Sequence, residues 1–397
     1  MLAALFAISV IGSLLGGTPD EPIFNKQDIF TPEHKHNHAS CIVELPDGDL
    51  FVAWYSGSGE RKADDVVIKG VRKKKGATSW GESFVLSDTP GYPDMNPSIF
   101  VGPDRSFWLV YPTVLDHRWE GALLKYFVAD ANAIPLEPRP PVWKRQGVFH
   151  VTPTAFDKVL ERALSKLEPA PVKIDETSVS ELSKRARDPL YQRLGWMPRV
   201  HPTVLPSGRW LWPLYTDTFS ASIVAYSDDR GETWKFGTPM VGFGNIQPSL
   251  VRKNDGTVVA LMRDNGRQRR IKRSESKDEG ATWSEVAETN LPNPGAGIEA
   301  IRLENGHWIL AYNDLTSGRQ SLAVSLSDDE GATWKWTRHV EKHKPGEGLY
   351  HYPSLIQTRD GLIHLTYTKG ALPPGSTIEH AWFNEAWIKS EAGESRK

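Results

Sequence analysis

One eight-residue motif occurs three times in this chain and constrains its fold more than any other feature. The pattern is S-x-D-x-G-x-T-W, with copies at Ser227–Trp234, Ser276–Trp283 and Ser327–Trp334. Successive copies begin 49 and 51 residues apart. A repeat of about fifty residues built from short β-rich units is typical of propeller blades.

The composition of the motif suits a tight hairpin between two strands. An aspartate side chain accepts hydrogen bonds from backbone N–H groups inside a turn. Glycine supplies the residue with positive φ. The tryptophan is a large apolar side chain, and we expect it to pack between neighbouring sheets.

A second signature occurs six times: a polar residue, small residues, a hydrophobic strand, a turn and another hydrophobic strand. Two apolar runs around an Asp-Gly or Asn-Gly turn predict a β-hairpin. Six copies predict an all-β, six-bladed β-propeller over residues 20–390, with four strands in each blade. If the six polar residues are equivalent, their side chains converge on one mouth of the central channel. They are His38, Asn96, His201, Gln247, Glu299 and Tyr352.

Residues 115–198 break this rhythm. The segment is rich in proline around residues 134–142, and helix-like patterns follow at Phe156–Leu164 and Val179–Arg185. We interpret it as a partly helical insertion between blades 2 and 3, which either caps the binding mouth or decorates the surface.

The composition excludes several classes of protein. A net charge of −2 provides no field for nucleic acid or an anionic membrane. The single cysteine, Cys41, excludes an intramolecular disulfide framework and is expected to be a small buried residue in a strand.

The N-terminus carries an apolar run, Leu2–Leu15, that is too short for a comfortable membrane span and is followed by small residues. It predicts a signal peptide at residues 1–17, although a basic start is missing. The mature protein is then secreted or periplasmic without a membrane span, or cytoplasmic if the leader is not cleaved.

Two arginines and three carboxylates are further candidates for a site at the mouth. Arg263 ends a strand and Arg319 precedes one, and each offers a planar fork suited to a carboxylate. A plain surface ion pair is the alternative for both, and the basic run 267–273 offers other candidates. The loop after the second strand of blade 1 holds a possible general acid or base. The candidates in this loop are Glu60, Arg61, Asp64 and Asp65, where Glu60 and Arg61 could instead form an exposed ion pair.

The repeats resemble the sialidase superfamily, in which the eight-residue motif is the Asp-box. The stronger similarity is to the sialidase-like BNR branch, over His38–Gly48, Asn293–Leu303 and Tyr352–His364. The resemblance covers nearly the whole chain except the insertion. Asp-boxes lie on the outside of blades, so they are specific for this kind of propeller and not for an activity.

The resemblance implies a retaining glycoside hydrolase that removes a terminal acidic sugar, sialic acid or a relative, from a glycan without a cofactor. Tyr352 matches the nucleophile. Glu299 lies near the glutamate that takes the tyrosine proton, with an alignment that can be off by two residues. Asp65 or Asp64 resembles the general acid/base, and Arg263 and Arg319 resemble two of three carboxylate-binding arginines. A neutral phenol meets less repulsion from the sugar carboxylate than an anion would, but it needs a neighbouring base.

The sequence departs from that family at the first arginine, where it has His38. Either Arg61, Lys35 or another basic residue substitutes, or the sugar is different. The histidines of this region are His34, His36, His38, His201 and His351. They could serve acid/base chemistry or a metal, but the strand-like spacing of the first three suits one metal poorly, and we predict no metal site.

Two alternatives to a sialidase-type hydrolase therefore remain open. One is another carbohydrate chemistry on the same propeller, as in a uronic-acid hydrolase or a polysaccharide lyase. The other is a glycan-binding propeller without catalysis. The joint presence of Tyr352, Glu299, Arg263 and Arg319 disfavours the non-catalytic alternative, whereas His38 disfavours the sialidase.

Overall fold

The computed structural model describes residues 21–166, 173–174, 177–370 and 375–390. The signal peptide predicted at residues 1–17 lies outside these described residues. Within them, no helix is both long and apolar enough to cross a membrane.

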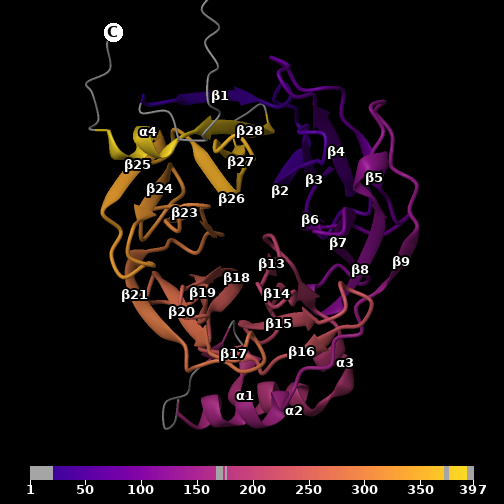
Figure 1. The fold of residues 1–397 in the computed structure, drawn as a ribbon. Coiled ribbons are helices and arrows are strands. Elements are labelled where there is room, and N and C mark those ends of the chain that lie inside the picture. The colour runs from indigo at the N-terminus through magenta and orange to yellow at the C-terminus, as the bar shows by residue number, and fades with distance from the viewer. Residues whose placement is uncertain (1–20, 167–172, 175–176, 371–374, 391–397) are drawn as a thin grey trace, which may run out of the picture.

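Six antiparallel sheets follow one another around a ring and form the six-bladed propeller that the sequence predicts (Figure 1). Blade 1 holds β2 (His36–Glu44), β3 (Leu50–Gly57), β4 (Val67–Lys73) and β5 (Phe84–Ser87). Blade 2 holds β6 (Ser98–Val101), β7 (Ser106–Val114), β8 (Ala122–Asp130) and β9 (Arg145–Val148). Blade 3 holds β12 (Trp196–Met197), β13 (Thr203–Val204), β14 (Trp210–Thr216), β15 (Ala221–Ser227), β16 (Lys235–Phe236) and β17 (Met240–Val241).

The remaining blades are more regular. Blade 4 holds β18 (Asn245–Arg252), β19 (Val258–Asp264), β20 (Arg270–Ser276) and β21 (Ala287–Pro292). Blade 5 holds β22 (Glu299–Arg302), β23 (Trp308–Tyr312), β24 (Ser321–Ser327) and β25 (Trp336–Lys342). Blade 6 holds β26 (Leu349–Gln357), β27 (Ile363–Gly370), β28 (Ser376–Phe383) and, as its outer strand, β1 (Phe24–Asp28).

The ring is closed by pairing the start of the chain with its end. Strand β1 is antiparallel to β28, from the Phe24–Phe383 pair to the Asp28–Glu379 pair. Figure 1 shows this as the indigo β1 beside the yellow β28. Main-chain hydrogen bonds therefore join the two ends of the sequence, and the ring cannot open without breaking them.

The helical segment lies on the outside of the ring, next to β16 and β17 (Figure 1). It comprises α1 (Phe156–Ser165), the short strands β10 (Lys173–Ile174) and β11 (Thr177–Ser178), α2 (Val179–Arg187) and α3 (Pro189–Arg193). Helix α1 buries Phe156, Leu160 and Leu164 in a cluster shared with blades 2 and 3. Strands β8 and β9 also fall within the predicted insertion at 115–198, but they pair with β7 as the outer half of blade 2. The α-helical part therefore begins only at Phe156, after two short 3-10 helices at Trp119–Gly121 and Ala131–Ala133.

The eight-residue motif forms the turn after the third strand in blades 3, 4 and 5. In blade 3 the Asp229 carboxylate accepts the Thr233 N–H at 2.8 Å, and Ser227 Oγ accepts the Gly231 N–H at 2.7 Å. The equivalent aspartate bonds in blades 4 and 5 are also 2.8 Å long. Gly231 has a φ of 84°, so the predicted roles of aspartate and glycine are confirmed.

The motif tryptophan fills the space between adjacent blades, as predicted. The Trp234 ring centroid lies 6.1 Å from that of Trp108 in blade 2 and 6.0 Å from that of Trp212 in blade 3. Aromatic pairs at this separation stabilise packing beyond the area that they bury. The motif therefore acts as a wedge on the outer part of the propeller.

Replacing Gly231 by alanine tests this wedge. A Cβ atom there would lie 2.5 Å from the Trp108 ring, in addition to the strain of a positive φ. Gly208 has a φ of 90° and nothing within 4 Å of the same added atom, so Gly208→Ala is a matched control for strain alone.

We expect Gly208→Ala to lower the free energy of unfolding by about 1–2 kcal/mol and Gly231→Ala by about 2–5 kcal/mol, because overpacking adds to strain. Urea denaturation measures both. Equal losses in the two variants would contradict close packing of Trp108 over the turn.

Candidate active site at one mouth of the channel

The innermost strands of all six blades can be aligned through their hairpins, because each hairpin has the same length. The pairs that close them are Glu44–Leu50, Val101–Phe107, Val204–Trp210, Arg252–Val258, Arg302–Trp308 and Gln357–Ile363. The residue three positions before the first member of each pair belongs to what we call the inner layer. These residues are Cys41, Ser98, His201, Ser249, Glu299 and Ser354. Five residues before each pair lies the mouth layer: Ala39, Asn96, Arg199, Gln247, Gly297 and Tyr352.

The six polar residues expected to be equivalent fall into different layers. Asn96, Gln247 and Tyr352 belong to the mouth layer, and the expectation is wrong for the other three. His201 and Glu299 lie two residues deeper, in the inner layer, and His38 precedes the mouth-layer position of blade 1.

For His38 the physical reason is a bulge in β2, and the same register shift occurs in β18 and β26. The β13–β14 and β22–β23 pairings near His201 and Glu299 show no such shift, and each of these two residues simply lies two positions nearer its hairpin. Four mouth-layer residues have φ in the left-handed region, between 41° and 56°: Ala39, Asn96, Gln247 and Tyr352.

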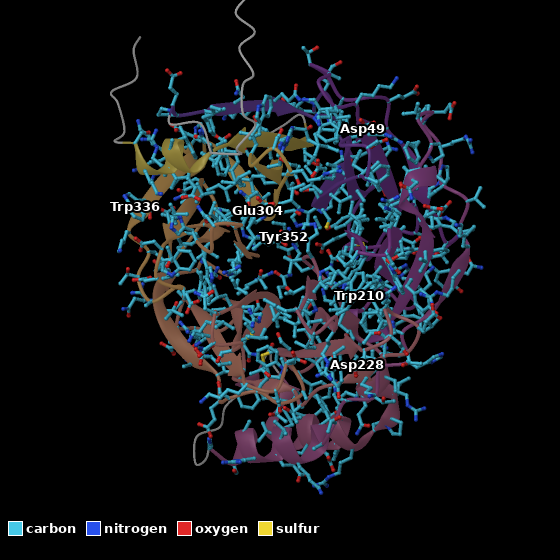
Figure 2. All side chains as sticks on the ribbon, in the orientation of Figure 1. Asp49, Trp210, Asp228, Glu304, Trp336 and Tyr352 are labelled. Atoms are coloured by element: carbon cyan, nitrogen blue, oxygen red, sulfur yellow. The ribbon has the colours of Figure 1, made fainter. Side chains whose placement is uncertain are left out.

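Tyr352 is the centre of the mouth layer and lies near the middle of the ring in Figure 2. Its hydroxyl oxygen accepts hydrogen bonds from Gln247 Nε2 and Arg263 Nη1, both at 3.0 Å. On one side the His38 ring lies 4.3 Å away between centroids. A bulky residue at a φ of 50° is strained, and such strain is characteristic of functional sites.

The space for this arrangement comes from Gly297, the mouth-layer residue of blade 5. A Cβ atom at Gly297 would lie 2.9 Å from the Tyr352 ring and 3.0 Å from Gln247 Oε1. Any other residue there would displace the contact between Gln247 and Tyr352.

The two predicted arginines come together with Tyr352. Besides Tyr352, Arg263 donates from Nη2 to Asn265 Oδ1 at 3.0 Å. Arg319 donates to His351 Nδ1 at 2.5 Å and to the Gly295 carbonyl at 2.7 Å. Burial lowers the pKa of Arg319, and the nearby Arg263 lowers it further. Both remain cations, so the mouth holds two like charges that an anionic ligand would relieve.

The histidines beside this pair are neutral. Burial, reinforced by Arg319, lowers the pKa of His351 to about 3. Burial, then His351, holds the pKa of His38 well below its ordinary value. His38 Nδ1 lies 2.9 Å from Thr368 Oγ1. His38 therefore supplies no positive charge in place of the arginine implied by the resemblance. Among the described residues, no group of three or more His, Cys, Asp or Glu is placed to hold a metal ion.

The carboxylates of the blade 1 loop have different surroundings. Glu60 accepts from the Tyr55 hydroxyl at 3.3 Å and from Arg61 Nη1 at 3.2 Å, so the predicted Glu60–Arg61 ion pair is present. The Tyr55 ring lies 5.6 Å from the His38 ring between centroids, so Glu60 is linked to the mouth through Tyr55.

The two aspartates of the same loop point elsewhere. Asp65 accepts from the Ser58 N–H at 3.0 Å, which lowers the pKa of Asp65. Asp64 is paired with the exposed His117 at 2.5 Å. Glu60 is therefore the loop carboxylate that the structure connects to the neighbours of Tyr352.

Arg61 lies on the rim and not beside the other two arginines. Its guanidinium is 4.9 Å from the centroid of the Trp119 ring, and it is half-buried there against Glu60. The predicted contact of Arg61 with a substrate stays a prediction.

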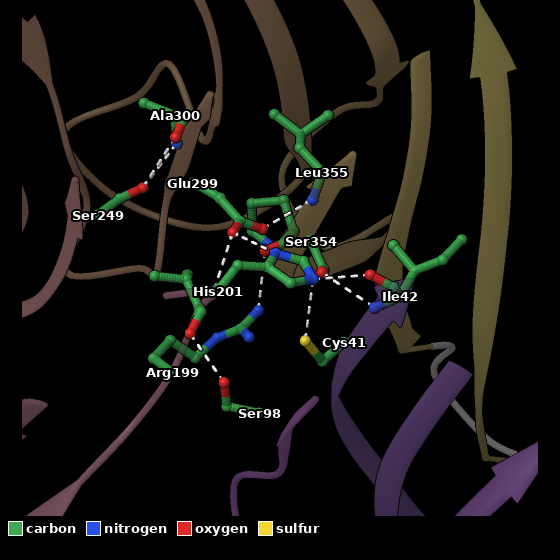
Figure 3. A network of polar contacts seen from close by, with 12 residues as sticks. Cys41, Ile42, Ser98, Arg199, His201, Ser249, Glu299, Ala300, Ser354 and Leu355 are labelled. Atoms are coloured by element: carbon green, nitrogen blue, oxygen red, sulfur yellow. Dashed lines mark hydrogen bonds and ion pairs between the residues drawn. The ribbon is translucent and has the colours of Figure 1, made fainter. Parts of the chain in front are cut away.

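Glu299 does not contact the Tyr352 hydroxyl, contrary to the pairing that the resemblance implied. Its Oε1 lies 2.7 Å from His201 Nδ1, and its Oε2 accepts the Leu355 N–H at 2.7 Å (Figure 3). Both oxygens are thus engaged one layer below the mouth. Among the described residues, no carboxylate is hydrogen-bonded to Tyr352, and Gln247 occupies the place next to its hydroxyl.

His201 is held as an imidazolium. Its Nδ1 faces Glu299 Oε1 and its Nε2 faces the Ile42 carbonyl at 2.6 Å, so both nitrogens meet acceptors. Burial lowers the pKa of His201, but Cys41 and Glu299 outweigh it and the net shift is well above the ordinary value. Burial likewise raises the pKa of Glu299, and the charge of His201 outweighs it, leaving that pKa below its ordinary value. The pair is a buried ion pair.

Arg199 is a mouth-layer residue that the sequence analysis missed. It is 1% exposed, its guanidinium lies 4.7 Å from the Tyr352 ring centroid, and it donates to the Pro353 carbonyl at 2.9 Å. It also donates to the Ser40 carbonyl at 3.3 Å. It lies two residues before His201 along the chain, and that spacing was the available signal. Arg199 braces the bulges of blades 6 and 1 from across the channel.

Comparison with known proteins agrees with this architecture. Residues 193–365 match the model of the BNR repeat-like domain. A xyloglucanase from a Paenibacillus species is 28% identical over 198 residues, and the anhydrosialidase of Macrobdella decora is 26% identical over 190 residues. These alignments cover 42% and 41% of this chain but only 18% and 23% of the respective relatives.

Solved structures share the fold at low identity. A leech intramolecular trans-sialidase superposes with a TM-score of 0.67 at 13% identity, covering 92% of this chain and 71% of that one. A protein of unknown function from Dyadobacter fermentans gives 0.65 at 16% identity, covering 92% of this chain and all (100%) of that one. Together these findings show that this chain is similar to sialidase-like BNR proteins, the similarity that its motifs predicted.

Replacing Glu299 by glutamine tests the buried ion pair. The change leaves an uncompensated imidazolium, and we expect a loss of about 3–5 kcal/mol in the free energy of unfolding. Glu304 is exposed, so Glu304→Gln is the control and should have little effect.

The loss should depend on pH. Because the pKa of His201 is raised on folding, its contribution is complete below the ordinary histidine value and disappears as pH rises through the folded-state pKa. Because the pKa of Glu299 is lowered, its contribution is present above the ordinary glutamate value and disappears as pH falls through the folded-state pKa. Urea titrations across pH measure both limits. A pH-independent difference between wild type and variant would contradict the ion pair.

Proposed function

We propose that this protein is a carbohydrate-active enzyme of sialidase type that cleaves a terminal acidic sugar from a glycan at the Tyr352 mouth. The observation that carries the proposal is the contact of the Tyr352 oxygen with Arg263, beside Arg319. Two cations at the end of a propeller channel suit the carboxylate of such a sugar. The relatives support the substrate class, because they include an anhydrosialidase, a sialidase and an intramolecular trans-sialidase.

In this proposal Tyr352 is the nucleophile: its oxygen bonds to the anomeric carbon as the glycosidic C–O bond breaks, and its phenol proton passes to solvent. Water then hydrolyses the tyrosyl–sugar bond and releases the sugar. Negative charge on its oxygen is stabilised by the N–H donors of Gln247 and Arg263. Glu60 is the general acid that protonates the departing oxygen. The resemblance implies Asp65 or Asp64 for this role instead. Glu299 and Arg199 act as positioning residues, because they hold the backbone on which Tyr352 is mounted.

A specific observation favours a second candidate, elimination on a uronic acid. The Tyr352 hydroxyl lacks a carboxylate to take its proton, whereas the neutral His38 ring lies against it. In a lyase, His38 would take the proton beside the sugar carboxylate, Tyr352 would protonate the leaving oxygen, and an arginine would neutralise the carboxylate. A glycan-binding propeller without turnover is the remaining alternative.

Tyr352→Phe and Arg319→Met separate these functions. We expect wild-type protein to release a terminal acidic sugar from a panel of fluorogenic sialosides and uronosides, and Tyr352→Phe to abolish release. Arg319→Met should raise KM by about 10- to 150-fold, the loss of one charged hydrogen bond. An unsaturated, ultraviolet-absorbing product from a polysaccharide would indicate the lyase. Glycan binding without any turnover would overturn both enzyme readings.

Gln247→Glu tests the role of Tyr352 directly. The substitution places a carboxylate 3.0 Å from the tyrosine oxygen without changing the shape of the site. The substitution also removes the N–H donor that stabilises negative charge on the tyrosine oxygen, so kcat of the hydrolase should fall by roughly 100-fold if Tyr352 is the nucleophile. Asn96→Asp, in the mouth layer of blade 2, is the matched control and should keep its kcat. An unchanged or higher kcat in Gln247→Glu, or an equal fall in both variants, would contradict this role.

A further inference from the structure

A buried cation lies in blade 1 at the hairpin end of its strands, which is the end away from the mouth layer. Lys73 ends β4 and is 9% exposed. Its Nζ lies 4.8 Å from the ring centroid of Trp382 and 5.9 Å from that of Trp80. Lysine is almost never buried to this extent without a charged partner.

Lys73 has only a neutral partner. The side-chain oxygen of Gln27 accepts from its Nζ at 2.5 Å in the amide orientation that satisfies both ends of Gln27. No ion pair with a carboxylate is formed by Lys73 among the described residues. Burial lowers the pKa of Lys73 and no neighbouring charge opposes this. The positive charge is therefore uncompensated.

A cavity of about 270 Å³ lies beside this lysine. Its lining includes Lys74, Lys75 and the stacked pair His364 and His380. The two carboxylates in the lining are engaged elsewhere: Glu44 with Arg359 at 3.1 Å, and Asp360 with Thr358 Oγ1 at 2.6 Å.

The same cavity holds an unsatisfied buried nitrogen. His380 is 1% exposed, its Nε2 lies 2.9 Å from His364 Nδ1, and its Nδ1 has no hydrogen-bond partner among the described residues. A buried polar atom without a partner costs about 1–3 kcal/mol. Two independent features, an unpaired cation and an orphan nitrogen, thus lie at one cavity.

The register explains the lysines that line this cavity in blade 1. Leu50 pairs with Lys73 where Trp210, Val258 and Trp308 pair with the first serine of the eight-residue motif. Lys73 therefore replaces the motif serine, and two residues later Lys75 replaces the motif aspartate. In the intact copies the aspartate carboxylate accepts the hydrogen bonds of the turn. Blade 1 has lost that internal anion and gained two cations.

We propose that this cavity is a binding site for a tetrahedral oxyanion, sulfate or phosphate, either free or as an ester on a sugar. The oxyanion would accept from Lys73 Nζ, with Lys74 and Lys75 at the rim, and would satisfy His380 Nδ1 in its protonated tautomer. The site does not depend on the function proposed for the Tyr352 mouth, since it shares none of its residues.

Sulfate titration of the full chain tests the proposal. We expect saturable binding of inorganic sulfate or phosphate by calorimetry, and a rise in Tm above that in sodium chloride of equal ionic strength. Lys73→Met should weaken Kd by about 10- to 150-fold. Lys277 is exposed in the equivalent turn of blade 4, so Lys277→Met is the matched control and should bind as wild type. This comparison also removes the general stabilisation of proteins by sulfate.

Two additions keep the test decisive. If Lys73→Met does not fold by circular dichroism, Lys73→Gln or His380→Phe replaces it, with the same expected loss. Glucosamine 6-sulfate and glucose 6-phosphate identify the source: tighter binding than the inorganic anion assigns an ester, and equal binding assigns the free anion. No binding by wild type, or binding by Lys73→Met at wild-type affinity, would overturn the proposal.

Discussion

Hydrogen bonds between the innermost strands hold the six blades around one channel, and every other feature of the structure depends on them. Inner-layer side chains bond to the backbone of the next blade: Cys41 to Ile99, Ser98 to Val200, Ser249 to Ala300, Glu299 to Leu355 and Ser354 to Ile42. Between blades 3 and 4 the bond comes from Thr203 to Leu250, because His201 instead reaches across the channel to Glu299. A buried polar group must be paired, so these side chains fix the spacing of the blades.

The mouth of the channel is built on that ring and inherits its electrostatics. The opposite charges of His201 and Glu299 cancel within the inner layer. Arg199 remains a buried cation against the Tyr352 ring. Above it, Arg263 and Arg319 add positive charge and the neighbouring histidines add none. Such a site attracts an anion and stabilises negative charge on the tyrosine oxygen. It differs from the arrangement that the resemblance implied, because Gln247 stands beside the hydroxyl and the carboxylate of Glu299 is committed to the fold.

Blade 1 shows how one repeat departs from the others without disturbing the ring. Its third strand ends in lysines where blades 3, 4 and 5 have the serine and aspartate of their turn. Asp49 partly replaces the lost carboxylate, since it accepts the Lys75 N–H at 2.8 Å and pairs with Arg72 at 2.7 Å. The pairing of β1 with β28 supports this junction from the other side. The departure can therefore persist at the place where the two ends of the chain meet.

The sequence by itself determined the propeller, the number of blades, the turn chemistry of the motif and the burial of Cys41. Each of these follows from short patterns of residues along the chain. It also identified Tyr352, Arg263 and Arg319 as neighbours through their strand ends. Only the tertiary structure decided which inner-strand residues share a layer. A bulge adds one residue without any signature in the sequence, so in blade 1 it moved His38 out of the mouth layer. The contacts of Glu299 with His201 and of Arg199 with the Tyr352 ring join different blades, so neither could be found along one strand. The distances that define the site are between blades, and a pattern along one chain carries no information about contacts across the channel.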